Sequence, residues 1–264
     1  MMAHNIKIIK KFLFERILSL IPTKKRESFK KKIFFGNKRF CPVCDSFIKK
    51  FYDYYFPSYI KIGPRQNAVC PVCGSIERER LLWFYLEEYT DFFKPPKKKI
   101  LHVAPEIVLS DRIKQNKFIE YLSADLDPTR AMTGIDLTDI KINSNFFDVI
   151  ICNHVLEHIP DHKKAMREIY RVLKTGGWAI LQVPILGEQT FEDPDAVTPE
   201  TREKRYGFAE HVRGYGKDYK DFLAQSGFSV KVDDFVNKLE KKTIEFLGLP
   251  DHEDIYFCKK YELR

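Results

Sequence analysis

Residues 147–185 read FDVIICNHVLEHIPDHKKAMREIYRVLKTGGWAILQVPI, and this stretch contains a complete strand–helix–strand pattern. The apolar run at 147–153 predicts a buried strand, and the periodic pattern after it predicts a helix over 162–174 that Gly176 and Gly177 end. A second apolar run predicts a strand over 178–185. Two strands joined by a helix favour a parallel pair, because a parallel connection has to cross over the sheet.

The same alternation continues on both sides of this stretch. Further apolar runs predict strands at 98–104, 118–126, 228–235 and 254–263, and periodic segments predict helices at 75–93, 106–116 and 217–227. Strands that alternate with helices indicate an α/β fold with a mostly parallel sheet covered on both faces. Because such sheets bind ligands at the carboxyl ends of their strands, the residues that follow each strand are the candidates for a functional site.

Three segments resemble a known family. They are SADLDP (123–128), NFFDVIICNHVLEHIPD (145–161) and REIYRVLKTGGWAILQVP (167–184), and together they resemble class I S-adenosylmethionine-dependent methyltransferases of the type-11 kind. The resemblance spans 123–184 and extends more loosely over 75–264. It implies a Rossmann-like, seven-stranded, mostly parallel sheet, S-adenosylmethionine as the cofactor, and a methyltransferase activity (EC 2.1.1.-). The order of a cysteine ribbon, LHVAPE and HVRGYG resembles a bacterial subgroup with an N-terminal zinc ribbon.

The resemblance also implies which residues bind the cofactor. Asp125 ends the second strand, where a carboxylate can accept hydrogen bonds from both ribose hydroxyls, and Asp127 is the fallback. The alternative for either residue is a helix cap. Asp136 and Leu137 occupy the place where the family sets an acid and a backbone amide near the adenine, and the alternative there is a simple turn.

The loop after the first strand departs from the family pattern, which is an acidic residue followed by a Gly-x-Gly turn. Here His102 stands in place of the acid, and Glu106 follows where the flexible centre is expected. Glu106 can pair with the methionine ammonium, while the small Ala104 permits close approach of the ligand. Asn153, after the fourth strand, is expected to line the same pocket. The alternative is a degenerate site that no longer binds the cofactor.

The connection 184–216 is long for an ordinary loop and predicts a lid over the acceptor site. It ends in His211-Val-Arg213, whose two polar side chains point the same way if the backbone is extended. We expect His211 or His154 to act as the catalytic base and Arg213 to bind an anionic or hydroxyl-rich acceptor. The alternative for His211 is a lid residue hydrogen-bonded to backbone.

Methyl transfer from a sulfonium is an in-line displacement, so the protein mainly aligns the acceptor and removes its proton. No NPPY-like stretch follows the fourth strand, which argues against methylation of exocyclic base amines, and no Pro-Cys pair supplies a nucleophile for a pyrimidine ring. Cys152 is therefore interpreted as a buried strand residue. His158 and His162, at the start of a helix, are predicted to cap it or to face solvent.

Two Cys-Pro-Val-Cys pairs, 25 residues apart, predict a metal site. The pairs are Cys41 with Cys44 and Cys70 with Cys73, and the two-residue spacer lets both thiolates of a pair bind one tetrahedral ion. Four cysteine ligands leave no open position, so the prediction is a structural zinc ribbon over 40–74. The alternatives are two disulfides or a redox pair; reduced thiols in the expected cytoplasmic setting argue against the first, and duplication of the motif argues against the second.

The positive charge of the chain is concentrated at one end. The 264 residues carry a net charge of +8, yet residues 1–40 contain 12 Lys and Arg against 2 Asp and Glu, so the remainder is slightly acidic. Apolar residues at Ile9, Phe12, Leu13, Ile17 and Leu20 predict an amphipathic helix that Pro22 ends within a basic arm over 1–39. Such a helix suits an anionic membrane surface or a partner protein.

These observations predict a three-part chain: the basic arm, the ribbon, and a methyltransferase domain over 75–264. The expected reaction is O-methylation of a small-molecule or glycan-type acceptor, with a lipid-linked acceptor compatible with the arm, in a cytoplasmic protein with peripheral contact at the inner face of the membrane. One alternative is an RNA methyltransferase whose ribbon and arm bind phosphates, although the acidic body disfavours a nucleic-acid partner. The other is a non-catalytic zinc-ribbon interaction protein with a degenerate pocket.

Overall fold

The computed structural model describes residues 16, 18–55 and 63–262. Two compact units make up the chain: one is formed within 1–81 and 240–250, and the other comprises 82–239 and 251–264. Among the described residues, no helix has both the length and the apolar character needed to cross a bilayer. Of the predicted amphipathic stripe, only Leu20 lies within the described residues, and its side chain is 81% exposed.

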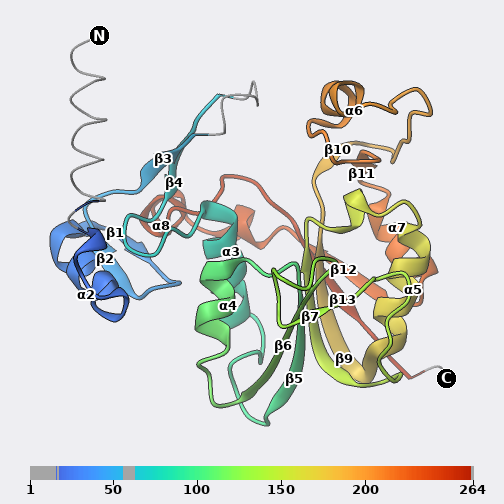
Figure 1. Ribbon diagram of the computed structural model, residues 1–264, viewed down its shortest axis with the longest axis horizontal. Helices are drawn as coiled ribbons and strands as arrows, with labels where there is room; N and C mark the ends of the chain where they lie inside the picture. Colours follow the sequence, from blue (N-terminus) through green and yellow to red (C-terminus); the bar gives the residue numbers. More distant parts are fainter. Residues whose placement is uncertain (1–15, 17, 56–62, 263–264) are drawn as a thin grey trace. The chain divides into compact units, whose positions relative to one another are not determined.

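The larger unit is built on a seven-stranded sheet, as the sequence predicts. The strand order is β12-β13-β9-β8-β5-β6-β7, with the central pairs parallel and only the β12–β13 and β13–β9 pairs antiparallel. The fold is therefore an α/β, Rossmann-like, mostly parallel sheet (Figure 1). Its strands are β5 (Lys98–Val103), β6 (Ile119–Asp125), β7 (Thr133–Gly134), β8 (Phe147–Asn153), β9 (Leu173–Gln182), β12 (Ser229–Asp233) and β13 (Ile255–Lys259).

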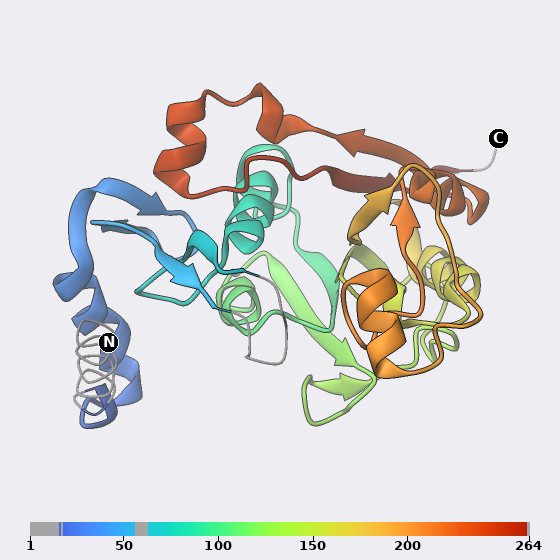
Figure 2. The same ribbon diagram turned by 90° about the horizontal axis from the view of Figure 1, so that it is seen from above.

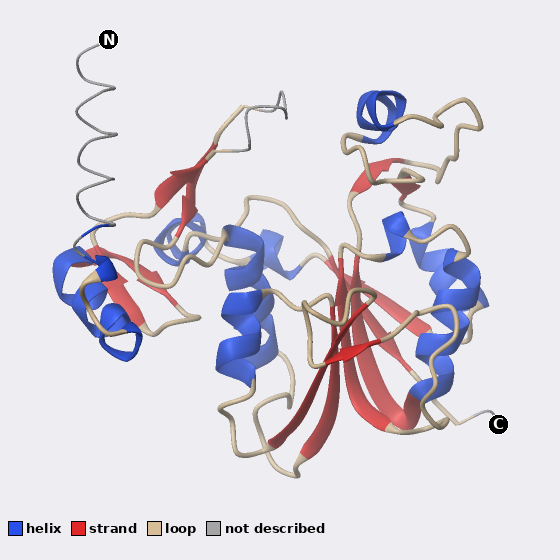
Figure 3. Cartoon of the chain, in the orientation of Figure 1, coloured by secondary structure: helices blue, strands red, loops and turns tan. Residues whose placement is uncertain are grey.

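Helices cover both faces of this sheet (Figure 3). Helices α5 (His162–Val172) and α7 (Tyr219–Gln225) lie on one face, where they contribute to an apolar core with alternate strand residues such as Leu101 and Ile150. Helix α4 (Ile107–Ile113) lies on the other face. Two short 3-10 helices complete the unit, η1 (Leu156–His158) and η2 (Phe235–Lys238). This packing explains why the central strands carry runs of buried apolar residues rather than a strict apolar–polar alternation.

The glycine pair in the deciding stretch has a different role from the predicted one. Helix α5 already ends at Val172, and β9 begins at Leu173, so Gly176 and Gly177 lie within a strand. The register between β8 and β9 shifts at this point, and a Cβ atom on Gly177 would lie 2.8 Å from the carbonyl oxygen of Asp148. Glycine is needed here because the two backbones approach closely, not because a helix has to stop.

The connection after β9 has secondary structure of its own. It contains β10 (Ile185–Gly187), α6 (Pro199–Tyr206) and β11 (Tyr215–Gly216), and β10 pairs in parallel with β11 beside α6 (Figure 2). Thr198 caps α6 through a capping box, and Gly207 ends it in the left-handed conformation. Because β10 follows β9 directly, this connection lies beyond the carboxyl end of β9 (Figure 1).

The smaller unit consists of two short hairpins and flanking helices. Strand β1 (Phe35–Cys41) pairs with β2 (Ser46–Ile48), and β3 (Tyr52–Tyr54) pairs with β4 (Arg65–Val69), both antiparallel. Helix α2 (Thr23–Phe34) precedes them, α3 (Glu77–Glu88) starts in this unit and continues into the larger one, and α8 (Lys241–Leu247) returns to it from far along the chain. The sequence patterns did not predict α8 or its association with the ribbon.

One buried cation holds α8 in the smaller unit. The Arg80 guanidinium is fully buried and donates hydrogen bonds to the carbonyl oxygens of Leu247, Gly248, Ala68 and Ser75. It also lies over the Phe51 ring, 3.9 Å from the ring centroid. These contacts connect residues 167 and 168 positions apart, so tertiary structure rather than local pattern places α8.

Candidate active site and metal centre

The two predicted ribose ligands at the end of β6 differ in their hydrogen bonds. Asp125 is half-buried, and its Oδ1 accepts a hydrogen bond from the backbone N–H of Asp127. Asp127 instead uses its own Oδ1 to accept from the N–H and hydroxyl of Thr129, which is a capping turn. These two bonds also lower the pKa of Asp127 below its ordinary value. Asp127 thus has the cap role. Asp125 Oδ2 lies 3.9 Å from Arg130 Nε, and its binding of a ribose stays a prediction.

The loop after β5 makes its turn without glycine. Ala104 takes a positive φ of 43°, and its N–H donates to the carbonyl oxygen of Ala124 at 2.7 Å. This φ is costly for a residue with a Cβ atom, so the surrounding bonds have to hold it.

A buried network replaces the usual acidic residue of the first strand. His102 is fully buried, with Nδ1 3.0 Å from the Tyr121 hydroxyl and Nε2 2.8 Å from Glu106 Oε2. The other oxygen of Glu106 accepts a hydrogen bond from Asn153 Nδ2 at 3.1 Å. One carboxylate therefore bridges the ends of β5 and β8, the two central strands of the sheet.

This network fits the ammonium group of an S-adenosylmethionine molecule. Burial acts to raise the pKa of Glu106, but the hydrogen bond and charge of His102 and the bond from Asn153 outweigh it, so the pKa falls below its ordinary value. The carboxylate is thus ionised at neutral pH, and 19% of its side chain stays exposed. Asn153 Oδ1 is buried with no hydrogen-bond partner, and an ammonium N–H is a suitable donor for it.

Of the two residues predicted to lie near the adenine, one is exposed and the other is in the core. Asp136 is exposed, and its Oδ1 accepts from the N–H and hydroxyl of Thr138, which lowers the pKa of Asp136. Leu137 is buried in the apolar core. Asp136 also lines a hollow of about 250 Å³ beside β6 and β7, together with Gly134 and Ile135. The turn bonds of Asp136 are those of the alternative reading, while its place on the hollow is compatible with a ligand.

Both histidines predicted as bases lie beside a carboxylate that the sequence analysis missed. His154 follows β8 with a positive φ of 54°, and its Nδ1 lies 3.6 Å from Glu157 Oε1. His211 comes from the connection after β9, and its Nε2 lies 3.9 Å from the same oxygen. Glu157 is buried, with only 1% of its surface exposed, and neither carboxylate oxygen has a hydrogen-bond partner. The sequence pattern that could have identified Glu157 is an acidic residue between two histidines, directly after a buried strand.

Burial sets the protonation of His211. Burial lowers its pKa below the ordinary value, the Glu157 carboxylate acts in the opposite direction, and His158 adds to the lowering. The imidazole is therefore neutral at physiological pH and able to accept a proton or bind a metal. His211 Nδ1 also lies 3.3 Å from the carbonyl oxygen of Tyr206, so the backbone contact of the alternative reading is present as well.

The remaining two histidines of this region differ from each other. His158 is exposed, as predicted, but its ring lies 4.8 Å from that of His211, edge to face. His162 was expected to cap a helix or face solvent, and this is wrong: it is buried, with Nδ1 2.6 Å from the hydroxyl of Tyr215. The side chain of Asp161 caps α5 instead, by accepting from the N–H of Lys164.

Arg213 is buried and bonded to main-chain carbonyls, a position that was not predicted from its place two residues after His211. Its side chain is 1% exposed, and it donates to the carbonyl oxygens of Leu156, Ile159 and Pro160 and to Glu192 Oε1. These bonds use four of the five guanidinium N–H donors, which leaves little capacity to bind an acceptor. The structure gives Arg213 a positioning role: it attaches the connection after β9 to the segment that carries Glu157.

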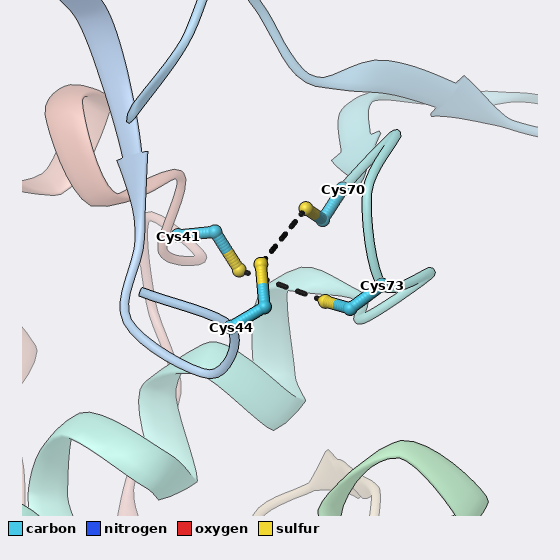
Figure 4. A group of neighbouring side chains, drawn as sticks. All are labelled: Cys41, Cys44, Cys70 and Cys73. Carbon is cyan, nitrogen blue, oxygen red and sulfur yellow. Dashed lines mark hydrogen bonds between the residues drawn. The ribbon is translucent and has the colours of Figure 1, made fainter. Parts of the chain in front are cut away.

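The four cysteines of the two pairs converge in the smaller unit (Figure 4). Their Sγ atoms all lie within 4.8 Å of one another, and Cys41–Cys73 and Cys44–Cys70 are each 3.8 Å apart. Sulfurs bound to a tetrahedral zinc at about 2.3 Å stand about 3.8 Å from each other, whereas disulfide sulfurs are about 2.0 Å apart. All four thiols are free, so the disulfide alternative is contradicted and the geometry fits a metal ion.

Local backbone geometry and two serines support this cluster. Gly74 and Asp45, which follow the two pairs, take positive φ values of 87° and 49°, as expected of knuckle turns. Ser75 Oγ lies 3.3 Å from Cys41 Sγ and 3.2 Å from Cys73 Sγ, and Ser46 Oγ lies 3.2 Å from Cys44 Sγ. Each serine stands two residues after a cysteine. The hydroxyl of Ser75 contacts the sulfurs, and the helix predicted from residue 75 begins only at Glu77.

Comparison with known proteins agrees with this geometry. The family model described as "Methyltransferase domain" matches residues 109–181, the segment from α4 through β9. This segment of the chain is therefore similar to a methyltransferase domain. The match includes Asp125, Asn153, His154 and Glu157, but it ends before the connection that carries His211.

The individual proteins to which the chain is similar are distant. The chain is 22% identical over 147 residues to phosphoethanolamine N-methyltransferase 2 of Caenorhabditis elegans, covering 55% of this chain and 32% of that protein. It is 38% identical over 55 residues to arsenite methyltransferase of Mus musculus, covering 18% and 15%. The chain thus spans a third or less of the curated relatives it matches. A solved structure, a putative sarcosine dimethylglycine methyltransferase from Galdieria sulphuraria, has 14% identity and a TM-score of 0.49, covering 70% of this chain and 89% of that chain.

Proposed function

We propose that the protein transfers the methyl group of S-adenosylmethionine to an oxygen of a small-molecule or glycan-type acceptor. The observation that carries this proposal is that His154 and His211 both lie within 3.9 Å of the same oxygen of the buried Glu157 carboxylate. A sulfonium donor is already activated, so an amine acceptor needs little help, whereas a hydroxyl acceptor needs a group that takes its proton. Two imidazoles beside a carboxylate, next to the strand end that carries Asn153, supply such groups.

The cofactor is assigned to the network at the ends of β5, β6 and β8. Glu106 and Asn153 hold the methionine ammonium, and Asp125 accepts from the ribose hydroxyls. The sulfonium supplies an electrophilic methyl group. This assignment rests on the ionised state of Glu106, the orphaned Asn153 oxygen and the position of Asp125 at its strand end.

The acceptor class is supported by the names of two relatives and by the position of the connection after β9. The names of the two curated relatives refer to small acceptors, phosphoethanolamine and arsenite. The connection 184–216 carries His211 to the acceptor side and acts as a lid or wall of that site. The four cysteines hold a structural zinc ion, which stabilises the smaller unit and takes no part in the transfer.

The test follows the methyl group. The full chain is incubated with S-adenosylmethionine labelled at the methyl carbon and with separated pools of small metabolites, glycans, lipid-linked glycans and RNA. We expect label in a small-molecule or glycan fraction, in a product stable to mild alkali. Label in RNA alone contradicts the acceptor class, and calorimetry that detects no cofactor binding at millimolar concentration supports a degenerate pocket.

Histidine variants then test the base. With the labelled acceptor in hand, His154→Ala and His211→Ala are compared with His252→Ala, an exposed histidine in the same unit. Loss of a general base lowers kcat by about 10² to 10⁴. We expect that loss in at least one of the first two variants and none in the third. Full turnover in both of the first two would contradict the proposal.

A further inference from the structure

Three side chains at the acceptor side form a second potential metal site, separate from the cysteine cluster. Glu157, His158 and His211 each offer one ligand atom, and these atoms lie within 4.8 Å of one another. Glu157 and His158 are adjacent in η1, and His211 reaches them from the connection after β9. The proposed base accounts for a histidine beside Glu157. It does not account for His158 or for the absence of hydrogen-bond partners on the Glu157 oxygens, so this convergence requires its own explanation.

The carboxylate of Glu157 is the first sign of a missing cation. It is 1% exposed and neither oxygen has a hydrogen-bond partner, while the nearest imidazole nitrogens are 3.6 Å and 3.9 Å away. A buried carboxylate without such partners is destabilised, because it has lost its hydration and gained no hydrogen bond in exchange. Arg213 is close in the fold, but it donates to Glu192 and to main-chain carbonyls.

The orientation of the two imidazoles is the second sign. His211 Nδ1 lies 3.3 Å from the carbonyl oxygen of Tyr206, and His158 Nδ1 lies 3.2 Å from that of Glu210. A carbonyl only accepts hydrogen bonds, so Nδ1 carries the proton in both rings and Nε2 keeps its lone pair. Histidines that bind metals commonly donate their other N–H to a carbonyl in this way.

We propose that Glu157, His158 and His211 bind a divalent transition-metal ion. Two imidazoles and one carboxylate suit Fe²⁺, Co²⁺, Mn²⁺ or Zn²⁺ and leave further coordination positions open. The same ion connects η1 to the lid segment, because His211 belongs to the connection after β9. Unlike the four-cysteine cluster, this site can therefore accept a ligand from the substrate.

This inference rests on the proposed function and gives it a mechanism for activating the acceptor. A hydroxyl bound to the ion becomes more acidic. His154 is outside the ligand set, so it remains to take the proton as the O–H bond breaks. The new O–CH₃ bond forms while the C–S bond breaks, and the sulfonium leaves as a neutral thioether. No oxidant or reductant is needed.

The experiment measures metal binding without relying on turnover. The full chain is freed of metal, loaded with one equivalent of Zn²⁺ to fill the cysteine cluster, since thiolates favour Zn²⁺, and titrated with Co²⁺ by calorimetry and visible absorption. We expect one further equivalent of Co²⁺, bound at least about tenfold more weakly by Glu157→Gln and by His158→Ala. His158 is exposed, so its variant tests the site even if Glu157→Gln fails to fold; exposed His252→Ala is the matched control and keeps wild-type binding.

The outcomes separate this inference from the proposed function. Absence of a second equivalent of Co²⁺, or equal affinity in the wild type and in His158→Ala, overturns the metal site while methyl transfer can still be observed. Binding of Co²⁺ that depends on His158 supports the site even if no acceptor is labelled. In that case the proposed function fails and the metal site stands.

Discussion

Asn153 donates a hydrogen bond to Glu106 across the ends of the two central strands, with Nδ2 3.1 Å from Oε1. The second carboxylate oxygen of Glu106, Oε2, is hydrogen-bonded to His102, so the carboxylate is fixed in orientation and charged. In this chain a half-buried, oriented carboxylate occupies the region where the family that the sequence resembles places flexible glycines. The consequences can be tested on cofactor binding.

Replacing Glu106 by Gln keeps the shape of the side chain and removes its charge. We expect S-adenosylmethionine affinity, measured by calorimetry, to fall about tenfold to a hundredfold, because a hydrogen bond to a charged group contributes about 1.5–3 kcal/mol. The control is Glu120→Gln, an exposed carboxylate on β6 that lies 3.8 Å from Lys99. Equal affinities in the two variants would show that Glu106 does not face the ligand.

Asp125 and Asp127 form a matched pair for the ribose assignment. Asp125→Ala removes the acceptor for the ribose hydroxyls, so the dissociation constant for the cofactor should rise by about tenfold or more. Asp127→Ala removes only a turn acceptor for Thr129 and should leave that constant nearly unchanged. If the Asp127 variant instead has the larger dissociation constant in the same titration, the ribose ligand is Asp127 and not Asp125.

The cysteine cluster predicts a zinc-dependent smaller unit. Cys70→Ser should lose the tightly bound zinc equivalent, measured by metal analysis, and limited proteolysis should then cleave within residues 1–81. The reason is that structural zinc contributes on the order of 10 kcal/mol to folding its site. Cys152→Ala, in the buried strand β8, alters a thiol outside the cluster and should retain the zinc. Retention of zinc by Cys70→Ser would refute the four-ligand assignment.

Arg213 should matter for stability more than for acceptor affinity. Arg213→Gln leaves up to three carbonyls and Glu192 without their donor, so the free energy of unfolding should fall by about 2–5 kcal/mol in urea titrations. Arg205→Gln, in the same connection but half-exposed, should cost less than about 1 kcal/mol. A stable Arg213 variant with a raised KM for the acceptor would instead support direct binding.

His162 predicts a loss of stability in acid. Burial and the positive charge of Arg213 lower the pKa of His162 to about 4, while Glu192 opposes them. The unfolded chain has the higher pKa of about 6.5 and therefore binds the proton first, so the free energy of unfolding falls as pH drops from about 6.5 to 4. This group accounts for up to about 3 kcal/mol of that fall.

The measurement is urea unfolding at pH 7 and pH 5. His162→Gln should reduce the difference between the two pH values, and His252→Gln, which replaces an exposed histidine, should not. An unchanged pH dependence in His162→Gln would show that another group titrates in this range.

Residues close in sequence were sufficient to predict most of the sheet and the cysteine cluster. Strands β5, β6 and β8 follow from apolar runs, because a strand buried on both faces has to be apolar throughout. The two cysteine pairs follow from spacing, because the spacer itself sets the knuckle geometry. Asp125 was assigned because it stands directly at a strand end.

Only the tertiary structure decided which distant side chains meet. Glu157 and His211 are 54 positions apart, and no periodic pattern connects them, yet one buried oxygen lies between His154 and His211. Arg213 became a clamp and α8 joined the ribbon unit for the same reason. Burial imposes hydrogen-bond and charge requirements on whichever groups the fold brings together, whereas local sequence determines only backbone conformation and the face on which a side chain lies.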